Sequence, residues 1–496
     1  MKLLSELVKD FDYTVVSGEL DTTLNDVVFD SRKAAADNVF VCIVGAVTDG
    51  HDYLGGAYDQ GCRVFVVEKN VTARDIAKKD DGVTIIRVEN TKRALACMSA
   101  ALFDAPAGKL KTIAVTGTKG KTTTTFMIRD ILEKHGIKTG IIGTTGVYVG
   151  EQYIKIANTT PASYDIHHFF QMMVEEGCAA CVMEVSSQAL KLDRTYGIMF
   201  DYGIFTNMAP DHIGKNEHAD YAEYVYCKSL LFQQCRHGVF NIDDKETVNM
   251  VKDASCDIHT YGLTDNADLY ADGIEYISGE GRLGIGFDVH GVWNDHIEVN
   301  TPGRFSVYNA LAAILVSELI GVDTENVKEA LLTTFVKGRV EQIKISDKFI
   351  LMIDYAHNAM SMESILKTMR EYHPKRIVSL FGCGGNRSKL RRYEMGETSG
   401  RLADLSVITA DNSRDEEVLD IIEDIKVGID KTEGEYVVIP DRKEAIKYTI
   451  VNAKEGDIIL LLGKGHEDYQ EIKGVKYPFD ERVIIREILT EIEKAK

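Results

Sequence analysis

The sequence predicts an α/β protein built from three domains. Its 496 residues exceed what one hydrophobic core normally organises, and the length by itself suggests about three domains. Short apolar strands alternate with helical stretches along the whole chain, a pattern typical of parallel sheets covered by helices. No internal repeat or low-complexity tract interrupts this alternation.

Two changes of pattern indicate the domain boundaries. Residues 104–109, Asp-Ala-Pro-Ala-Gly-Lys, are small and turn-forming and indicate a linker. The second change, Phe-Val-Lys-Gly-Arg at 335–339, follows a helical stretch that carries Val327, Ala330 and Leu331. We therefore predict an N-terminal domain at residues 1–105, a central domain at 106–336 and a C-terminal domain at 337–496.

The C-terminal segment has the pattern of a Rossmann-like, doubly wound sheet. Four apolar stretches are separated by helix-like segments, although the G-x-G-x-x-G fingerprint of dinucleotide sites is missing. The predicted strands span residues 377–381, 405–409, 436–439 and 458–462.

The central domain opens with a phosphate-binding loop. Residues 112–125 combine a β-branched apolar strand, a turn with Gly117 and Gly120, and a helix that begins Lys121-Thr122. Glycines and helix N–H groups can cradle phosphate oxygens, the lysine can reach the terminal phosphates, and the threonine can hold Mg²⁺. The form G-T-x-G-K-T-T is shorter than the general Walker pattern. An ordinary turn is disfavoured by the flanking strand and helix, so we predict a parallel-sheet ATPase domain with a P-loop.

Charge and cysteine usage exclude several classes of protein. The net charge is −20, from 57 basic and 77 acidic residues, which argues against a nucleic-acid or anionic-membrane partner. Charges interrupt every apolar window of the first ten residues, and no run reaches a membrane span, so we expect a cytoplasmic protein without membrane insertion. Nine scattered cysteines fit reduced thiols, and Cys178 and Cys181 lack the further ligands of a zinc site.

Two more strands end in residues suited to phosphate chemistry. A buried-looking strand over 179–184 ends in Glu184, where Mg²⁺ bound to ATP would need a carboxylate oxygen. A second strand runs into Asp211-His212, and Lys228 follows. Taken singly, Glu184 would be interpreted as a solvated turn residue, His212 as a structural histidine and Lys228 as a surface lysine.

These strings together resemble the Mur ligases, ATP-dependent amide-forming enzymes of peptidoglycan synthesis. The resemblance covers essentially the whole chain and is greatest to the type that adds the third peptide residue, 2,6-diaminopimelate (the MurE type). Besides G-T-x-G-K-T-T, M-E-V-S-S and F-T-N-x-x-x-D-H, it includes Asp30-Ser-Arg32, Asp49-Gly-His51, Asn158-Thr-Thr-Pro161, Gly338-Arg339, Asp354-Tyr-Ala-His357, Phe381-Gly-Cys-Gly-Gly385, Asp411-Asn-Ser-Arg414, Asp441-Arg442 and Gly463-Lys-Gly-His-Glu467.

The resemblance implies a set of site residues. The implied catalytic residues are Lys121, Glu184, His212 and Lys228. The implied Mg²⁺ ligands are Thr122, Glu184, His212 and Lys228. In the family, the lysine at the position of Lys228 carries a carbamate, which makes it an oxygen ligand. The implied ATP contacts are Gly117, Thr118, Lys119, Gly120, Lys121, Thr122, Thr123, Asn309, Arg339 and Asp354. The UDP-peptide contacts are Ser31, His51, Asn158, Thr159, Thr160, Ser186 and Arg194, and the amino-acid contacts are Arg392, Asp411, Asn412, Arg414, Gly463 and Glu467.

The implied function is the addition of meso-diaminopimelate to the D-glutamate of UDP-N-acetylmuramoyl-L-alanyl-D-glutamate, with ATP as co-substrate, by a monomer. One alternative is the same ligase using L-lysine or another diamino acid, but the fork of Arg414 suits a distal carboxylate that lysine lacks. The other is a P-loop switch without catalysis. Lys119, Gln188 and Ser413 depart from the type's usual residues and remove no metal or phosphate ligand.

Overall fold

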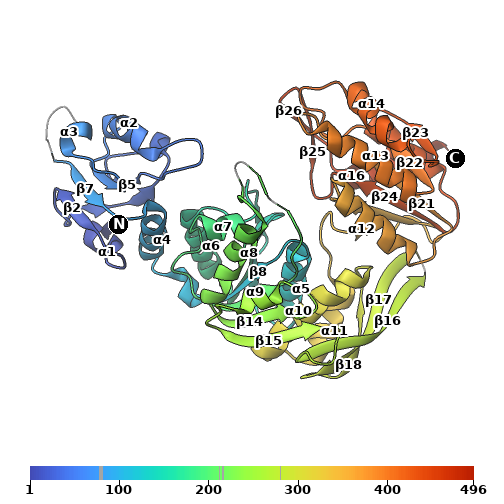
Figure 1. Cartoon of the computed structure of the whole chain (residues 1–496), viewed down its shortest axis with the longest axis horizontal. Coiled ribbons are helices and arrows are strands. Elements are labelled where there is room, and N and C mark those ends of the chain that lie inside the picture. Colours follow the sequence, from blue (N-terminus) through green and yellow to red (C-terminus); the bar gives the residue numbers. More distant parts are fainter. Residues whose placement is uncertain (77–81, 212, 215–216, 280, 496) are drawn as a thin grey trace. The chain divides into compact units, whose positions relative to one another are not determined.

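The computed structural model describes residues 1–76, 82–211, 213–214, 217–279 and 281–495. It is a mixed α/β structure, as the alternation of strands and helices predicts (Figure 1). The chain divides into two compact units, residues 1–268 with 312–326 and residues 269–311 with 327–496. Helices α10 (Arg304–Ile320) and α11 (Thr324–Thr333) each contribute to both units.

The N-terminal part is a five-stranded sheet in the order β2-β7-β6-β5-β4. Strands β4 to β7 are parallel and β2 is antiparallel to β7. Alternating residues of β6 face two separate buried clusters, Phe65 and Val67 on one side and Val64 and Val66 on the other. The elements are β1 (Lys2–Leu3), α1 (Leu4–Leu7), β2 (Thr14–Ser17), β3 (Thr23–Leu24), β4 (Asp26–Val28), β5 (Asn38–Val41), α2 (Leu54–Asp59), β6 (Val64–Val67), α3 (Ala73–Ile76), β7 (Thr84–Arg87) and α4 (Thr91–Leu102).

A largely parallel sheet forms the rest of the first unit. Its strands run in the order β11-β10-β9-β12-β8-β13-β14-β15, parallel from β9 to β15 and antiparallel at the β9-β10-β11 edge. The elements are β8 (Lys111–Thr116), α5 (Lys121–Lys134), β9 (Thr139–Gly143), β10 (Gly146–Val149), β11 (Gln152–Ile154), α6 (Ser163–Glu175), β12 (Ala180–Glu184), α7 (Ser187–Lys191), β13 (Phe200–Phe205), α8 (Tyr221–Ser229), β14 (Cys235–Asn241), α9 (Thr247–Val251) and β15 (Asp257–Gly262).

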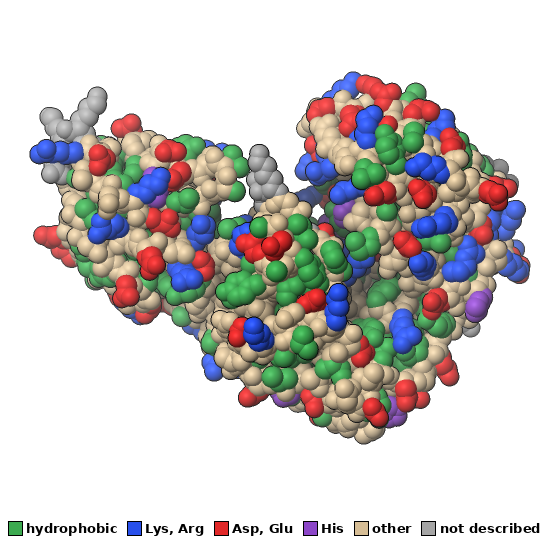
Figure 2. Space-filling model, viewed as in Figure 1, with side chains coloured by type: hydrophobic (Ala, Val, Ile, Leu, Met, Phe, Trp, Pro, Cys, Tyr) green, Lys and Arg blue, Asp and Glu red, His purple; other side chains and the backbone are tan. Residues whose placement is uncertain are grey.

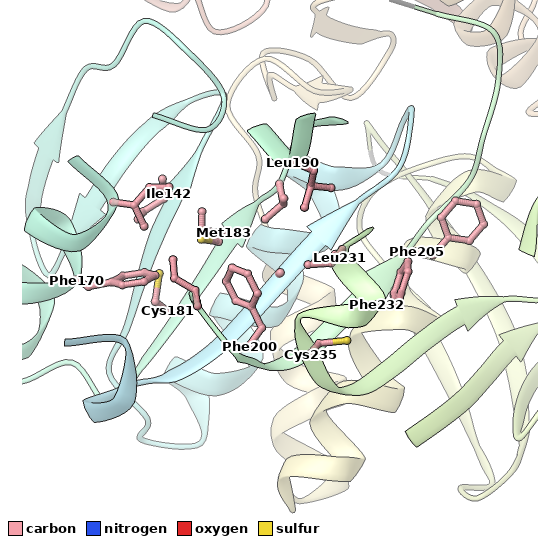
Figure 3. Close-up of a cluster of buried hydrophobic side chains, with 14 of the residues drawn as sticks. Ile142, Phe170, Cys181, Met183, Leu190, Phe200, Phe205, Leu231, Phe232 and Cys235 are labelled. Carbon is pink, nitrogen blue, oxygen red and sulfur yellow. The ribbon is translucent and has the colours of Figure 1, made fainter. Parts of the chain in front are cut away.

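A cluster of large apolar side chains fills one face of this sheet. Figure 3 shows Phe170 of α6 beside Cys181 of β12, with Met183 of β12 and Phe200 of β13 in the same cluster. Phe232 stacks at a tilt on Phe240, with ring centroids 4.4 Å apart. Burial of these side chains holds β8, β12 and β13 side by side, so their carboxyl ends form one edge of the sheet. Cys178 and Cys181 lie in this cluster, as predicted for core thiols.

The second unit begins with an antiparallel meander and continues into a parallel sheet. The meander comprises β16 (Leu269–Gly279), β17 (Arg282–Gly291) and β18 (Asp295–Val299). The sheet has the order β19-β20-β24-β21-β22-β23, and only β19 runs antiparallel. The elements are β19 (Glu341–Gln342), β20 (Ile350–Asp354), α12 (Ala359–Arg370), β21 (Arg376–Phe381), α13 (Lys389–Leu402), β22 (Leu405–Ile408), α14 (Val418–Ile429), β23 (Tyr436–Val438), α15 (Arg442–Val451), β24 (Asp457–Leu462), β25 (Tyr469–Ile472), β26 (Val475–Pro478) and α16 (Glu481–Ala495).

Helices cover both faces of this C-terminal sheet, which confirms the doubly wound prediction. Ile458, Leu460 and Leu462 of β24 pack with α12, α13 and α14, whereas Ile459 and Leu461 pack with α15 and α16. Strands that are apolar on both faces read as continuous hydrophobic runs. All four strands predicted here from sequence are present, within a residue or two at their ends, and two-sided burial explains three of them, β21, β22 and β24.

Surface and thiol properties agree with the composition. Figure 2 shows acidic and basic side chains interspersed over the face in view. All nine cysteines are free thiols, as predicted. Within the described residues, no helix is both long and apolar enough to cross a membrane.

Candidate active site

The phosphate-binding loop joins β8 to α5 and depends on two glycines. Gly117 has φ +144° and Gly120 has φ +85°, values that favour glycine. A Cβ atom on Gly117 would lie 2.0 Å from Thr206 Oγ1. Lys121 folds back over the loop and donates hydrogen bonds from Nζ to the carbonyls of Gly117 at 2.8 Å and Thr118 at 3.1 Å. The loop therefore gathers N–H groups and an ammonium at the positive end of a helix dipole.

The segment that follows β13 holds the phosphate-binding loop in place by hydrogen bonds. Asn207 accepts a hydrogen bond at Oδ1 from Lys119 N at 3.0 Å and donates one from Nδ2 to Lys119 O at 3.0 Å. Thr206 donates from Oγ1 to the same carbonyl at 2.7 Å. Because β13 is the parallel neighbour of β8, both strands end at the same edge. Thr206 and Asn207 belong to the F-T-N string, but sequence reasoning assigns no role to either residue.

Glu184 ends β12, the other neighbour of β8, with 1% of its surface exposed. Its Oε1 accepts hydrogen bonds from Thr122 Oγ1 at 3.0 Å and Thr144 N at 2.9 Å, and its Oε2 accepts one from Thr144 Oγ1 at 3.0 Å. A Cβ on Gly143 would lie 2.4 Å from Oε1. The structure thus brings together Thr122 and Glu184, two of the residues predicted to hold Mg²⁺, and adds Thr144, which sequence reasoning missed.

Lys228, in the last turn of α8, is buried beside the loop with 2% of its surface exposed. Its Nζ donates to Gly117 O at 2.9 Å and lies 4.7 Å from the centre of the Tyr224 ring. Burial holds the pKa of Lys228 well below its usual value, and the charge of Lys121 lowers it further. An exposed surface lysine would have neither this burial nor this lowered pKa. His212, the remaining predicted metal ligand, lies outside the described residues.

The predicted muramoyl-peptide residues of the central domain adjoin Glu184. Thr160 Oγ1 donates to Glu184 O at 2.9 Å and accepts from Ser186 N at 3.0 Å, and Arg194 Nη1 donates to Thr160 O at 2.6 Å. Thr159 Oγ1 lies 3.0 Å from Thr144 Oγ1. These contacts fix a polar surface next to the predicted metal ligands, and Asn158 is exposed beside it.

The predicted uridine residues occupy two short turns of the N-terminal domain. His51 donates from Nδ1 to Asp49 Oδ1 at 2.6 Å, because its Nε2 accepts from Glu68 N at 3.1 Å. One ring nitrogen therefore stabilises the turn, and the other ties it to the residue that follows β6. Ser31 begins a 3₁₀ turn, and its carbonyl accepts from Gln60 Nε2 at 2.9 Å.

In the second unit, Asp354 and Arg339 lie at the start of the C-terminal sheet. Asp354 ends β20 and accepts hydrogen bonds from Val340 N and Ala356 N, both at 2.8 Å. Burial raises the pKa of Asp354, although the charge of Arg339 opposes the shift. The Arg339 guanidinium lies 5.2 Å from the centre of the Tyr355 ring. Asn309, the other predicted ATP contact in this unit, is buried in α10.

Three predicted amino-acid contacts surround a buried lysine, and a fourth, Gly463, precedes it in the chain. Lys464 is fully buried and donates from Nζ to Asn412 Oδ1 at 3.0 Å and to Glu467 Oε2 at 2.7 Å. Its Nζ also lies 3.8 Å from Asp411 Oδ1, and a Cβ on Gly463 would lie 2.6 Å from Asp411 Oδ2. Sequence reasoning missed Lys464, although the G-K-G-H-E string contains it.

The two predicted arginines of this region differ in their surroundings. Arg414 has φ +50° and donates from Nη1 to Gly385 O at 2.7 Å, while its Nε lies 3.4 Å from Glu471 Oε2. Its side chain keeps 24% of its surface exposed. Arg392 is buried and pairs with Glu416 at 2.7 Å and Asp424 at 2.8 Å. The structure thus gives Arg392 carboxylate partners inside the domain, and its contact with an amino acid stays a prediction.

Comparison with known proteins identifies related sequences and structures. Three family models match the chain: Mur ligase family, catalytic domain, at residues 24–102; Mur ligase middle domain at 115–317; and Mur ligase, glutamate ligase domain, at 338–465. A UDP-N-acetylmuramoyl-L-alanyl-D-glutamate--2,6-diaminopimelate ligase of Clostridium acetobutylicum is 40% identical over 493 residues, covering 99% of each chain. This chain belongs to the Mur ligase family.

Other members of the Mur ligase family give the same result. The enzyme of the same name from Caldanaerobacter subterraneus is 40% identical over 493 residues, 99% of this chain and all of that one. A solved structure of a UDP-N-acetylmuramoyl-L-alanyl-D-glutamate--2,6-diaminopimelate ligase is 25% identical, with a TM-score of 0.73 over 99% of each chain. The sequence-based assignment to this family is therefore confirmed.

Proposed function

We propose that this Mur ligase adds meso-diaminopimelate to the D-glutamyl carboxylate of UDP-N-acetylmuramoyl-L-alanyl-D-glutamate in the cytoplasm, with hydrolysis of ATP to ADP and phosphate. The observation that carries the proposal is the full-length likeness to ligases named for this reaction. The P-loop, the buried Glu184 at its edge and Arg414 in the C-terminal domain supply the groups that the reaction needs.

The chemistry proceeds in two steps. A carboxylate oxygen of the substrate attacks the γ-phosphorus of ATP, the bond to the β-phosphate oxygen breaks, and an acyl phosphate and ADP form. The free amine of diaminopimelate then attacks the acyl carbon and phosphate leaves, with loss of the ammonium proton to solvent. Lys121 would stabilise the charge of the transferring phosphoryl group, as an ammonium at a P-loop does.

The donor set at the sheet edge fits Mg²⁺. Thr122 and Glu184 offer a hydroxyl and a carboxylate 3.0 Å apart, hard oxygen donors of the kind magnesium prefers. These residues, with Lys228 as a carbamate, would hold the ion, which neutralises phosphate charge when bound. The buried amine of Lys228 favours carbamylation because only an uncharged amine attacks CO₂; the new N–C bond forms as the amine loses a proton to water.

Diaminopimelate is favoured over lysine by the guanidinium of Arg414. Its contacts with Gly385 O and Glu471 use part of its five N–H donors, and its partial exposure leaves the fork accessible to a ligand carboxylate. Asn412 and Glu467, held in place by Lys464, would meet the amino-acid end of the substrate.

The test is a phosphate-release assay with the full chain, ATP, Mg²⁺ and the UDP-dipeptide, run with meso-diaminopimelate and with L-lysine. Release is expected only when dipeptide and diaminopimelate are both present, with a product whose mass equals their sum less one water. Equal turnover with lysine would overturn the amino-acid assignment. ATP hydrolysis that is independent of both substrates would instead favour a nucleotide switch.

A further inference from the structure

His218, Glu223 and Cys227 bring three different metal-ligating atoms together near the start and end of α8. Their donor atoms all lie within 4.8 Å of one another. His218 is fully buried and Cys227 is 3% exposed, whereas Glu223 is partly exposed. Among the residues that the structure describes, this is the group in which three His, Cys, Asp or Glu side chains lie close enough to hold one metal ion. None of the three belongs to the P-loop site.

Local structure explains why these side chains meet. Asp220 caps α8 by accepting from Glu223 N at 2.8 Å. Glu223 and Cys227 are four residues apart on this helix and therefore share one face. His218 precedes the cap, and its carbonyl accepts from Gly214 N at 3.0 Å, which turns the chain back toward the helix.

The imidazole is oriented as in a metal site. Ser187 Oγ, at the first residue of α7, lies 2.9 Å from His218 Nε2, and His218 Nδ1 faces Glu223 Oε2 at 3.8 Å. Metal-bound histidines commonly use their second nitrogen for a hydrogen bond of this kind. Tetrahedral zinc bound to nitrogen and oxygen at about 2.0–2.1 Å places these two donors roughly 3.3 Å apart, so the observed 3.8 Å has to shorten by only about 0.5 Å on binding.

We propose that His218, Glu223 and Cys227 bind a zinc-class transition-metal ion, with water in the fourth position. Nitrogen and sulfur donors select zinc or cobalt over magnesium, which requires oxygen ligands. Glu223 also contacts Lys191 Nζ at 2.9 Å and Ala219 N at 2.7 Å, and a carboxylate has about four acceptor positions to share among such partners. Binding transfers the thiol proton of Cys227 to solvent.

An ion at this site would tie the chain before α8 to the last turn of the helix. That turn also carries Lys228, so occupancy would stiffen the support of the predicted carbamate without contributing a group to the reaction. The metal assignment uses no step of the ligase mechanism and stands independently of it.

Cobalt(II) titration of the full-length, chelator-treated protein tests the proposal, because thiolate-bound cobalt gives a charge-transfer band in the near ultraviolet. One equivalent should produce the band, and excess Mg²⁺ should leave it unchanged. Cys227→Ser should lose the band and bind zinc at least tenfold more weakly, whereas Cys97→Ser, the matched cysteine change on α4, should do neither. Ser187→Ala should weaken binding about 10- to 100-fold, the usual effect of removing a histidine's second partner.

Any one of three results would overturn the proposal. The first is the absence of a stoichiometric cobalt band in the wild-type protein, a result that does not depend on the folding of any variant. Alternatively, the band would persist in Cys227→Ser, or disappear when Mg²⁺ is added.

Discussion

Replacing Glu184 by glutamine is expected to stop the ligase reaction without weakening the fold. An amide oxygen at the Oε1 position keeps the hydrogen bonds from Thr122 Oγ1 and Thr144 N. The amide NH₂ at the Oε2 position can donate to Thr144 Oγ1, whose proton then turns to Thr159 Oγ1, 3.0 Å away. Since every buried polar atom keeps a partner, the free energy of unfolding should change by less than about 1 kcal/mol.

The activity should respond very differently to Glu184→Gln. Glutamine removes the negative charge expected to hold Mg²⁺, and loss of one preorganised electrostatic stabiliser lowers kcat roughly 10²- to 10³-fold, or about 3–4 kcal/mol. The Mg²⁺ concentration needed for half-maximal rate should also rise. Glu184→Ala should lose activity and stability together, because it leaves buried donors unpaired at about 1–3 kcal/mol each.

Phosphate release and urea unfolding, measured on the same preparations, decide the matter. Glu175→Gln on the exposed surface of α6 is the matched control and should behave as wild type in both. The reasoning fails if Glu184→Gln keeps more than a tenth of the wild-type kcat, or if it is destabilised as much as Glu184→Ala.

Three further outcomes follow from the site and the core. Lys228→Ala should be inactive but partly restored by added formate or acetate, which can supply the missing oxygen ligand; full activity without additives would remove Lys228 from the mechanism. Arg414→Ala should lower kcat/KM for diaminopimelate roughly 30- to 4000-fold while leaving the KM for ATP unchanged, since one buried charge pair is worth about 2–5 kcal/mol; an unaltered preference over lysine would refute the specificity argument. His167 is buried in α6, and neither of its ring nitrogens has a hydrogen-bond partner among the described residues; burial lowers its pKa to about 4. Because the unfolded chain binds this proton more readily, stability should fall as the pH drops from about 6.5 to about 4, by about 3 kcal/mol in total. His167→Phe should lack this component of the acid loss in urea titrations at several pH values, and identical pH profiles for the two proteins would contradict it.

The fold and the phosphate loop were accessible from the sequence because their signals are local. Continuous apolar runs identify strands that are buried on both faces, as β21, β22 and β24 are. The loop needs Gly117, Gly120 and Lys121 within five residues, and its backbone geometry follows from that short segment. Similarly, the G-K-G-H-E string and the Asp411-Asn-Ser-Arg414 string each lie within a short segment, so both can be identified from the sequence alone.

Tertiary structure alone decided which distant residues meet. Thr122 and Glu184 lie 62 positions apart and become neighbours only because β12 pairs with β8. Strand order is set by packing across the whole sheet, so the sequence could not reveal that Thr144 completes the Glu184 site. The sequence also could not predict the partners of Lys464 and Arg392. Both side chains are of a type that is usually exposed, and only the fold buries them against particular carboxylates. Chemistry carried by one short segment was determined by the sequence, whereas pairing between segments required the fold, since it depends on which surfaces exclude water together.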